Sequence, residues 1–306
     1  LAPIFYADFG NRLLGDNEDE LADDPLFVGG NFWDGRATGW ELGNPAADQA
    51  QGPFLNPVEQ ALPDAACVVY RACEGAYGDL FDQVWGPNAC VINWPNNIQG
   101  QCSKSDGDIS LSGPDRAKVD RAYDRVALSV AAFEGSKASN AFTSKVDAHR
   151  AGLYEFSDEE ERGRQIFRGK GLCSQCHVGT PGPGAPPPLF TDFTYDNLGV
   201  PKNPENPFSV ANPDWQDPGL AGFLETVPDY DQYAPTNLGK QKVPTLRNVG
   251  LGSCEAMGDG DDSDGDKKGK KGGHKDDDCI VKAYMHNGYF KSLKTVVHFY
   301  NTRDVK

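Results

Sequence analysis

The sequence predicts a mainly helical protein with long irregular loops and few or no strands. Apolar side chains recur at helical spacing between residues 114 and 133, with charged residues between them. Ser157 and Glu160 have the spacing of a capping box, which predicts that another helix begins at Ser157. A third helix is expected over residues 292–301, where four side chains share one face: Leu293, Val296, Val297 and Tyr300. The 35 glycines and 22 prolines predict long loops between these helices.

Length and charge exclude several classes of protein. The 306 residues are enough for one large or two ordinary domains. No apolar run approaches the roughly 18 residues that a membrane-spanning helix needs, so no transmembrane segment is predicted. The formal net charge of −16 makes nucleic acid an unsuitable partner and favours a basic protein instead.

The most specific motif is Cys173-Ser174-Gln175-Cys176-His177, which reads C-x-x-C-H, the attachment site of a c-type heme. The two thiols add to the two vinyl groups of one heme, and the adjacent histidine reaches the iron as its proximal ligand. The alternatives are a redox disulfide or a pair of zinc ligands. A redox motif does not require the following histidine, and the chain has no second C-x-x-C to complete a zinc site. We therefore predict one covalent heme c, with His177 on the iron.

Six further cysteines predict disulfides and an oxidising compartment outside the cytoplasm, such as the periplasm. Buried free thiols are the alternative. Two of the six flank an Asp-, Lys- and Gly-rich insertion over residues 254–279 and are expected to pair. The other four allow three connectivities and are expected to hold together an irregular region at residues 61–110. The six are Cys67, Cys73, Cys90, Cys102, Cys254 and Cys279.

Several further segments, in order along the chain, resemble the diheme cytochrome c peroxidase family, including its MauG-like branch. Together with the heme motif, they agree with the family in order and rough spacing along nearly the whole chain. Each short match is weak alone, and their common order makes the resemblance specific. The segments are residues 32–37 (FWDGRA), 49–59 (QAQGPFLNPVE), 189–192 (LFTD) with 197–201 (NLGVP), 242–248 (KVPTLRN), and 283–288 (AYMHNG) with 298–301 (HFYN).

The resemblance implies two c-type cytochrome-like domains, one with a peroxidatic heme and one with an electron-transfer heme. Residues 1–150 would be the remainder of the peroxidatic-heme domain, and residues 151–306 the C-terminal heme domain. In this family the motif that precedes L-F-T-D holds the electron-transfer heme, so His177 would be the proximal ligand of that heme.

The peroxidatic heme's own C-x-x-C-H should precede Phe32, and residues 1–32 contain no such motif. We expect the chain to be a segment of a longer polypeptide whose upstream part carries the second heme. The alternative is that this heme has been lost. The resemblance also implies a calcium ion bound in part by the backbone carbonyls of Val281 and Ala283.

For the second ligand of the heme iron, the resemblance points to Tyr300. Peroxidases of the family often have methionine at this position, whereas MauG has tyrosine. The helical pattern agrees, because it directs Tyr300 to the interior and His298 away from it. Met285 is a weaker candidate, and a core tyrosine with a bonded hydroxyl is the alternative role for Tyr300.

The catalytic residues that the resemblance implies are Gln49, Pro53 and Glu59, over the open face of the peroxidatic heme. Glu59 would move a proton between the two oxygens of peroxide, and Gln49 would orient the peroxide. Trp33 would carry electrons between the hemes, and Arg247 would pair with a heme propionate. Without the resemblance, each of these residues has an ordinary role in packing or at the surface.

The function favoured by the sequence is a cytochrome c peroxidase-type oxidoreductase that reduces hydrogen peroxide. A basic cytochrome c-like protein would donate the electrons. The second hypothesis is a MauG-like oxidase of a protein substrate, which Tyr300 favours. The third is a non-catalytic electron-transfer cytochrome or a subunit of a larger redox complex. A homodimer is also compatible with the sequence.

Overall fold

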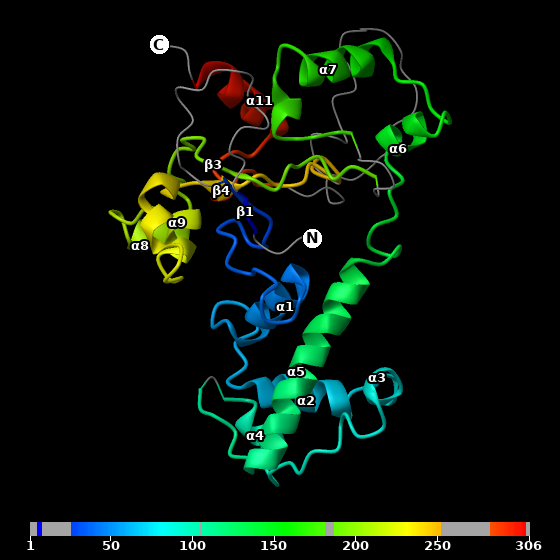
Figure 1. Ribbon diagram of the computed structural model, residues 1–306, viewed down its shortest axis with the longest axis vertical. Helices are drawn as coiled ribbons and strands as arrows, with labels where there is room; N and C mark the ends of the chain where they lie inside the picture. Colours follow the sequence, from blue (N-terminus) through cyan, green and yellow to red (C-terminus); the bar gives the residue numbers. More distant parts are fainter. Residues whose placement is uncertain (1–4, 8–25, 105, 181–186, 252–281, 304–306) are drawn as a thin grey trace, which may run out of the picture. The chain divides into compact units, whose positions relative to one another are not determined.

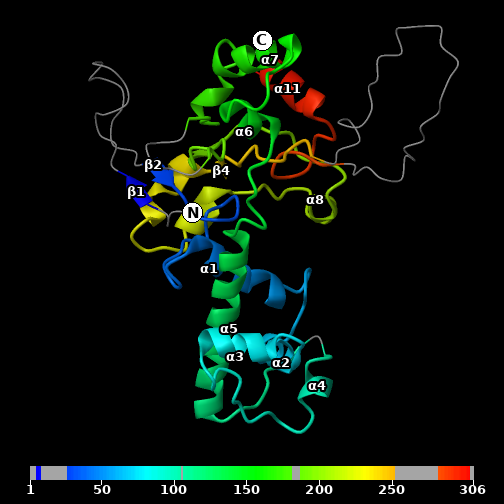
Figure 2. The same cartoon turned by 90° about the vertical axis from the view of Figure 1, so that its right-hand side faces the viewer.

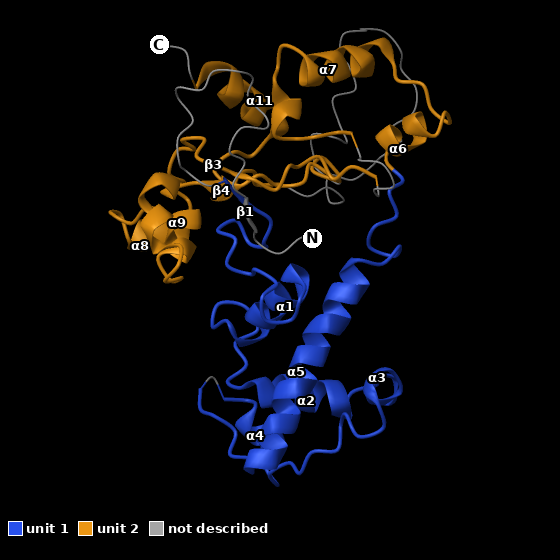
Figure 3. Cartoon of the chain, in the orientation of Figure 1, with its two compact units in different colours: residues 1–143 blue, residues 144–306 orange. Residues whose placement is uncertain are grey.

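The computed structural model describes residues 5–7, 26–104, 106–180, 187–251 and 282–303. The chain divides into two compact units, residues 1–143 and residues 144–306 (Figure 3). Within the described residues the strands are only two or three residues long, and the other regular elements are helices. The predicted fold class, mainly helical with few strands, is confirmed. The assignment of residues 1–150 and 151–306 to two heme domains stays a prediction.

The first unit is built around one long helix, α5 (Gly113–Glu134), which runs beside α1 (Pro45–Leu55) and α2 (Ala65–Glu74) in both views (Figures 1 and 2). The helix predicted over residues 114–133 is thereby confirmed. The remaining elements are two shorter helices, α3 (Gly78–Trp85) and α4 (Ile98–Gln101), and the antiparallel strands β1 (Phe5–Ala7) and β2 (Leu26–Val28).

Side-chain caps fix where these helices begin. The side chain of Asn44 accepts a hydrogen bond from the backbone of Ala46, and Pro45 follows it in the first turn of α1. The side chain of Ser112 caps α5 in the same way, by accepting from the backbone of Asp115. These caps satisfy backbone N–H groups that the helix itself leaves without partners.

Small and apolar side chains form the core of the first unit. Alanines of α1 and α5 meet in one cluster, which lets the two backbones approach closely. A larger cluster packs α2 against α5 and includes Val69, Val119 and Tyr123. The hydroxyl of Tyr123 donates to the backbone carbonyl of Gln51, and the amide of Gln51 donates to Asp124 at 2.8 Å. Helix α1 is therefore held on α5 by both packing and hydrogen bonds.

Residues 61–110 are more helical than the sequence predicted, since α2, α3 and α4 lie within them. Of the three possible connectivities, the structure has Cys67–Cys102 and Cys73–Cys90. Cys67 and Cys102 belong to the hydrophobic cluster under α5, so the first bridge is part of the core. The pairing expected between Cys254 and Cys279 lies outside the described residues.

Asp64 connects this region to α5. Its carboxylate accepts two hydrogen bonds from Arg116, at 2.7 and 2.8 Å, and one each from the backbones of Ala66 and Ile109, both at 2.7 Å. Burial acts to raise the pKa of Asp64, but these hydrogen bonds outweigh it and lower the pKa. The ionised side chain thus joins three segments that are distant in sequence.

The second unit is a chain of short helices joined by long loops. Its longest are α7 (Asp158–Arg168) and α11 (Leu293–Thr302), which lie near each other in both views (Figures 1 and 2). A two-stranded antiparallel sheet forms from β3 (Tyr195–Asp196) and β4 (Gln241–Lys242). The other elements are α6 (Lys145–Arg150), η1 (Cys173–Gln175), α8 (Pro207–Ala211), α9 (Leu220–Leu224), η2 (Asp231–Tyr233) and η3 (Pro235–Asn237).

None of the helices in the described residues is both long and apolar enough to cross a membrane.

Candidate heme site

Helix α7 delivers the chain to the C-x-x-C-H motif. The predicted capping box is confirmed, because Ser157 and Glu160 exchange side-chain and backbone hydrogen bonds at 3.0 and 3.2 Å. The helix ends at Arg168, and η1 begins at Cys173. Between them, Leu172 adopts a φ of 56°, a left-handed conformation that a side chain of this size rarely takes. Strain of this kind is concentrated at functional sites.

The imidazole of His177 is oriented for metal binding. Its Nδ1 lies 2.9 Å from the carbonyl oxygen of Phe190. A carbonyl can only accept a hydrogen bond, so Nδ1 carries the proton and Nε2 keeps its lone pair. This is the arrangement in which a backbone carbonyl fixes the tautomer of a ligating histidine. His177 therefore presents a ready ligand atom at Nε2.

The segment that carries Phe190 is itself held in place. The hydroxyl of Thr191 donates to the carbonyl of Val243 at 2.6 Å, and the hydroxyl of Thr245 donates to the carbonyl of Leu189 at 2.5 Å. Two segments of the family resemblance, L-F-T-D and K-V-P-T, are thus bonded to each other. Their common effect is to position the carbonyl that fixes His177.

The two thiols of the motif are not joined in a disulfide. The Sγ of Cys176 lies 3.6 Å from a carboxylate oxygen of Asp196. Burial, together with the charges of Asp196 and Asp192, raises the pKa of Cys176 to about 11. Both thiols are thus available for the thioether bonds that attach a heme.

Tyr300 lies on α11, within the helix that the sequence predicted. Burial raises its pKa, the charge of Arg303 acts to lower it, and Cys176 and Cys173 are near enough to raise it further. The structure differs from the predicted inward face of this helix in one respect. Tyr300 is 44% exposed, while Phe299 packs on Phe290. Tyr300 thus lies toward the heme motif and outside the packed protein interior.

The residues around the motif fit a heme. Neither α7 nor α11 buries a residue, although both carry apolar side chains. Ile166 is 41% exposed, Leu172 59% and Val297 59%. Exposed apolar groups of this kind, next to two free thiols and a histidine with an available Nε2, suit a large planar apolar group with an iron at its centre.

Arg247 has a protein partner in the structure. Its guanidinium binds both carboxylate oxygens of Asp147, at 2.6 and 3.0 Å, and donates to the carbonyl of Pro188 at 2.8 Å. It also lies over the ring of Phe190, 5.5 Å from its centre. The hydrogen bond from Arg247 is the main reason that the pKa of Asp147 falls to about 2. A bond to a propionate stays a prediction.

The predicted catalytic residues lie in the first unit. Gln49 and Pro53 are one turn apart on α1 and share a face of that helix. Pro53 has no N–H, so it cannot bond the carbonyl of Gln49 as an ordinary residue would. Glu59 is exposed and lies in a tight turn, where its backbone N–H donates to the carbonyl of Asn56 at 3.0 Å. The catalytic roles of these residues stay predictions.

Trp33 lies in a turn between Asn31 and Ala37, and its side chain is 51% exposed. The preceding Phe32 has a φ of 59°, and its ring is covered by the guanidinium of Arg36 at 3.8 Å. The turn is thus held in a strained conformation that leaves the indole accessible.

The candidate calcium ligands are only partly described. Ala283 is exposed, and Val281 lies outside the described residues. The described residues contain no group of three or more His, Cys, Asp or Glu side chains that could hold a metal ion. Met285, the weaker ligand candidate, is half-buried and has a φ of 67°.

Sequence reasoning missed several groups that support the site. The carbonyl of Phe190, the Asp147 partner of Arg247 and the bond from Tyr123 to Gln51 were not foreseen. Bonds to backbone carbonyls and pairs between distant residues cannot be recognised in a local sequence pattern. The one available signal was Asp147 itself, three residues after Ser144, which forms a second capping box.

Comparisons with known proteins agree with this geometry. A family model described as di-haem cytochrome c peroxidase matches residues 11–154. Methylamine utilization protein MauG of Paracoccus denitrificans is 30% identical over 277 residues, which is 90% of this chain and 54% of that protein. Cytochrome-c peroxidase IdrP1 of Denitromonas iodatirespirans is 28% identical over 204 residues, which is 63% of this chain and 43% of that protein.

The fold is similar to that of a solved diheme peroxidase, BthA from Burkholderia thailandensis. The TM-score is 0.62 at 25% identity, over 91% of this chain and 53% of that chain. The fold and the C-x-x-C-H site define a c-type heme protein. The chain is similar to proteins of the di-haem cytochrome c peroxidase family. It spans about half the length of the curated relatives it matches.

Proposed function

We propose that this chain is the part of a diheme peroxidase that holds the electron-transfer heme and the catalytic side chains of the peroxide pocket. The observation that carries the proposal is the bond between Nδ1 of His177 and the carbonyl of Phe190. It leaves Nε2 as a ligand atom beside two free cysteines. The relatives include cytochrome-c peroxidases, which supports the reaction class.

When bound, heme supplies one-electron redox chemistry at its iron and, where a coordination position is open, a place for peroxide to react. Cys173 and Cys176 would hold the macrocycle by thioether bonds. His177 and Tyr300 would bind its iron. Arg247, which rests against Phe190, would bind a propionate.

The first unit supplies the residues that orient peroxide and transfer its proton. Glu59 takes a proton from one peroxide oxygen and returns it to the other, which makes the second oxygen a better leaving group. Gln49 donates a hydrogen bond that orients the peroxide, and Pro53 lines the same pocket. The exposed indole of Trp33 passes electrons toward this pocket. The second heme belongs to this pocket, and the family's calcium ion would take the carbonyls of Val281 and Ala283.

The electron donor is a small basic protein such as a cytochrome c. The formal net charge of −16 attracts a basic partner and speeds their encounter at low salt. The two disulfides of the first unit suit an oxidising compartment, which we take to be the periplasm.

Tyr300 favours a second candidate function, the oxidation of a protein substrate as in MauG. An anionic oxygen ligand stabilises the ferric and higher states of heme iron and lowers its reduction potential. A heme with such a ligand accepts electrons poorly from ordinary cytochromes c and is better suited to removing electrons from a bound protein. Of the two curated relatives compared above, MauG matches the larger share of this chain.

The peroxidase proposal is tested by steady-state turnover of the native, heme-loaded protein with hydrogen peroxide and a reduced basic cytochrome c. Glu59→Gln is expected to lower kcat/KM for peroxide by about a hundredfold to ten-thousandfold, because proton transfer is lost. Glu74→Gln, an exposed carboxylate on α2, is the matched control and should retain full activity. Equal rates for the two variants would contradict the role of Glu59.

The same assay separates the two candidate functions. Rapid, peroxide-dependent oxidation of the reduced cytochrome supports the peroxidase. Peroxide consumption without oxidation of any cytochrome tested would favour the protein oxidase.

A further inference from the structure

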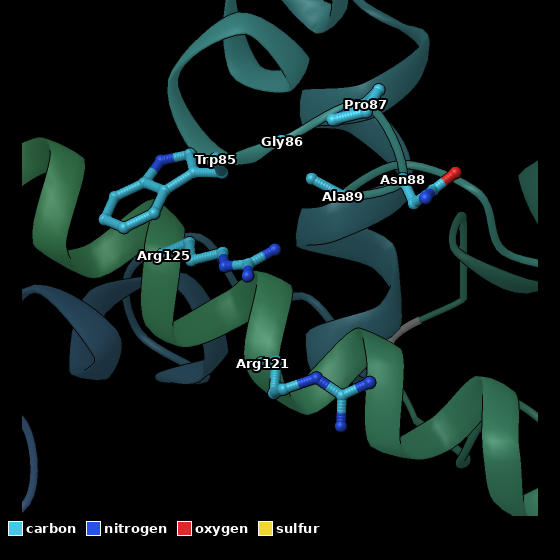
Figure 4. Close-up of a pocket in the computed structure, with 7 residues that line it drawn as sticks. All are labelled: Trp85, Gly86, Pro87, Asn88, Ala89, Arg121 and Arg125. Atoms are coloured by element: carbon cyan, nitrogen blue, oxygen red, sulfur yellow. The ribbon is translucent and has the colours of Figure 1, made fainter.

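The first unit carries an open groove between α5 and the segment that follows α3 (Figure 4). Its volume is about 300 Å³. Arg121 and Arg125 lie on the helix side, and Trp85 stands at one end. The backbone of residues 86–89 forms the opposite side. None of these residues belongs to the predicted heme or peroxide sites.

Among the described residues, the two arginines have no carboxylate partner. Neither guanidinium forms a salt bridge or donates a hydrogen bond within the described part of the chain, and Arg125 has only the ring of Trp85, 5.7 Å away. They are one helical turn apart, where like charges destabilise a helix. The chain has 45 acidic residues and only 29 Lys and Arg. Two adjacent unpaired arginines are therefore a local basic site on an acidic protein.

The groove is held in shape by several bonds. The indole nitrogen of Trp85 donates to the hydroxyl of Ser129 on α5 at 3.1 Å. The carboxylate of Asp82 accepts from the backbone of Cys90 at 3.1 Å, and the Cys73–Cys90 disulfide joins the segment to α2. A ligand would thus meet a preorganised surface and lose less free energy to ordering it.

Helix α3 also carries an exposed apolar face. Tyr77, which precedes the helix, is 61% exposed, and Leu80 and Val84 are 60% and 71% exposed. Their i, i+3 and i+7 spacing places them on one side of α3, which buries no residue at all. Contiguous exposed apolar side chains of this kind mark sites of protein association.

We propose that this groove and the apolar face of α3, together called the α3 surface, bind a segment of a partner protein that carries carboxylates beside apolar side chains. The guanidinium forks of Arg121 and Arg125 match the geometry of carboxylates. The apolar face of α3 receives the apolar side chains of the same segment. Charge complementarity selects an acidic partner here, in contrast to the basic electron donor, and the proposal does not depend on the proposed function.

The test uses the full native protein and a fluorescein-labelled peptide of alternating Glu and Leu, with fluorescence anisotropy as the readout. We expect saturable binding of the Glu peptide and none of its Gln counterpart. Arg121→Gln and Arg125→Gln should each weaken binding about tenfold or more, because each removes a charge-assisted hydrogen bond. Arg71→Gln, an exposed arginine of α2 outside the groove, is the control and should bind like the unaltered protein.

Equal binding of the Gln peptide, or no binding of the Glu peptide, would overturn the proposal with the unaltered protein alone. Displacement of the peptide by millimolar inorganic phosphate would also overturn it, since the groove would then be a small-anion site. The double variant Arg121→Glu/Arg125→Glu is expected to bind a Lys and Leu peptide instead. That gain of binding also shows that the variant is folded, and its failure with both peptides counts against the proposal.

Discussion

The proton on Nδ1 of His177 is the residue-scale feature on which the heme site depends. The carbonyl of Phe190 accepts it at 2.9 Å, and this fixes both the tautomer and the direction of the ring. Phe190 itself has a φ of 56°, an unusual conformation for an aromatic residue. The strain is maintained by the neighbouring bonds of Thr191 and Thr245. A site with this much local support has its ligand preorganised before a metal binds.

Tyr300→Phe tests the second ligand. Removal of an anionic oxygen from the iron is expected to raise the reduction potential of this heme and to change its visible spectrum. A spectroelectrochemical titration of the native protein measures both. Tyr289→Phe, on the loop before α11, is the control and should leave potential and spectrum unchanged. An unaltered potential in Tyr300→Phe would show that Tyr300 does not bind the iron.

Asp147 gives a prediction about pH. Its pKa in the folded protein is about 2, below its ordinary value of roughly 3.9, mainly because of Arg247. A lowered folded-state pKa means that the stabilisation is complete above the ordinary pKa and is lost as pH falls toward the folded value. The pair is largely buried, with both side chains 12% exposed. The contribution at neutral pH is therefore about 2 kcal/mol.

Asp147→Asn should accordingly lower the free energy of unfolding by about 2 kcal/mol at pH 7. The difference from the unaltered protein should stay constant down to about pH 5 and shrink between about pH 4 and 2. Guanidinium unfolding of the heme-loaded protein, followed by circular dichroism, measures it. A difference that grows as pH falls would be the opposite of this expectation.

At the scale of single elements, the two disulfides of the first unit differ in their surroundings. Cys67 is 0% exposed and Cys102 5%, so their bridge lies inside the core under α5. Cys73 and Cys90 are half-buried and close a loop with a sequence separation of 17, next to the α3 surface. The outer bridge therefore stabilises α3 locally, whereas the inner bridge is protected by the whole fold.

Under mild native reduction, Cys73–Cys90 is expected to open before Cys67–Cys102, because a reductant reaches it without unfolding of the core. Alkylation at successive times, followed by peptide mass spectrometry, gives the order. Removal of the outer bridge by Cys73→Ser/Cys90→Ser should cost about 3 kcal/mol. Simultaneous opening of both bridges would indicate that α3 does not move independently of the core.

The sequence predicted those elements whose determinants are local. The periodic apolar pattern located α5, and the Ser157–Glu160 box located α7. The helices of residues 61–110 were harder to predict from the sequence. Helices α3 and α4 are short, and this region is held by disulfides and by the distant pair Asp64–Arg116. Helix α11 was predicted correctly, but its packing face differs, since Phe299 packs on Phe290 while Tyr300 is 44% exposed.

For the whole molecule, the heme motif was the strongest signal in the sequence, and the family resemblance gave it a context that the comparisons support. The structure brings Cys173, Cys176 and His177 together in one unit, with Tyr300 in electrostatic range. The structure places Gln49 on α1 and Glu59 in the turn that follows it, but among the described residues neither side chain has a hydrogen bond or ion pair that indicates a role beside a heme. Their assignment therefore depends on function tests.

The acidic character of the chain also acts at this scale. A net charge of −16 favours a basic electron donor, while Arg121 and Arg125 provide one local site of opposite sign. Two partners of different charge could therefore approach different surfaces of the same protein.

The most direct test of the central claim is the number of covalent hemes per native polypeptide. A pyridine hemochrome assay, normalised to protein by amino-acid analysis, gives the count, and peptide mass spectrometry locates each heme. The similarity to the di-haem family predicts two hemes, one of them on the peptide that contains Cys173 and Cys176. A single heme per native polypeptide, or heme-free thiols at Cys173 and Cys176, would contradict the account.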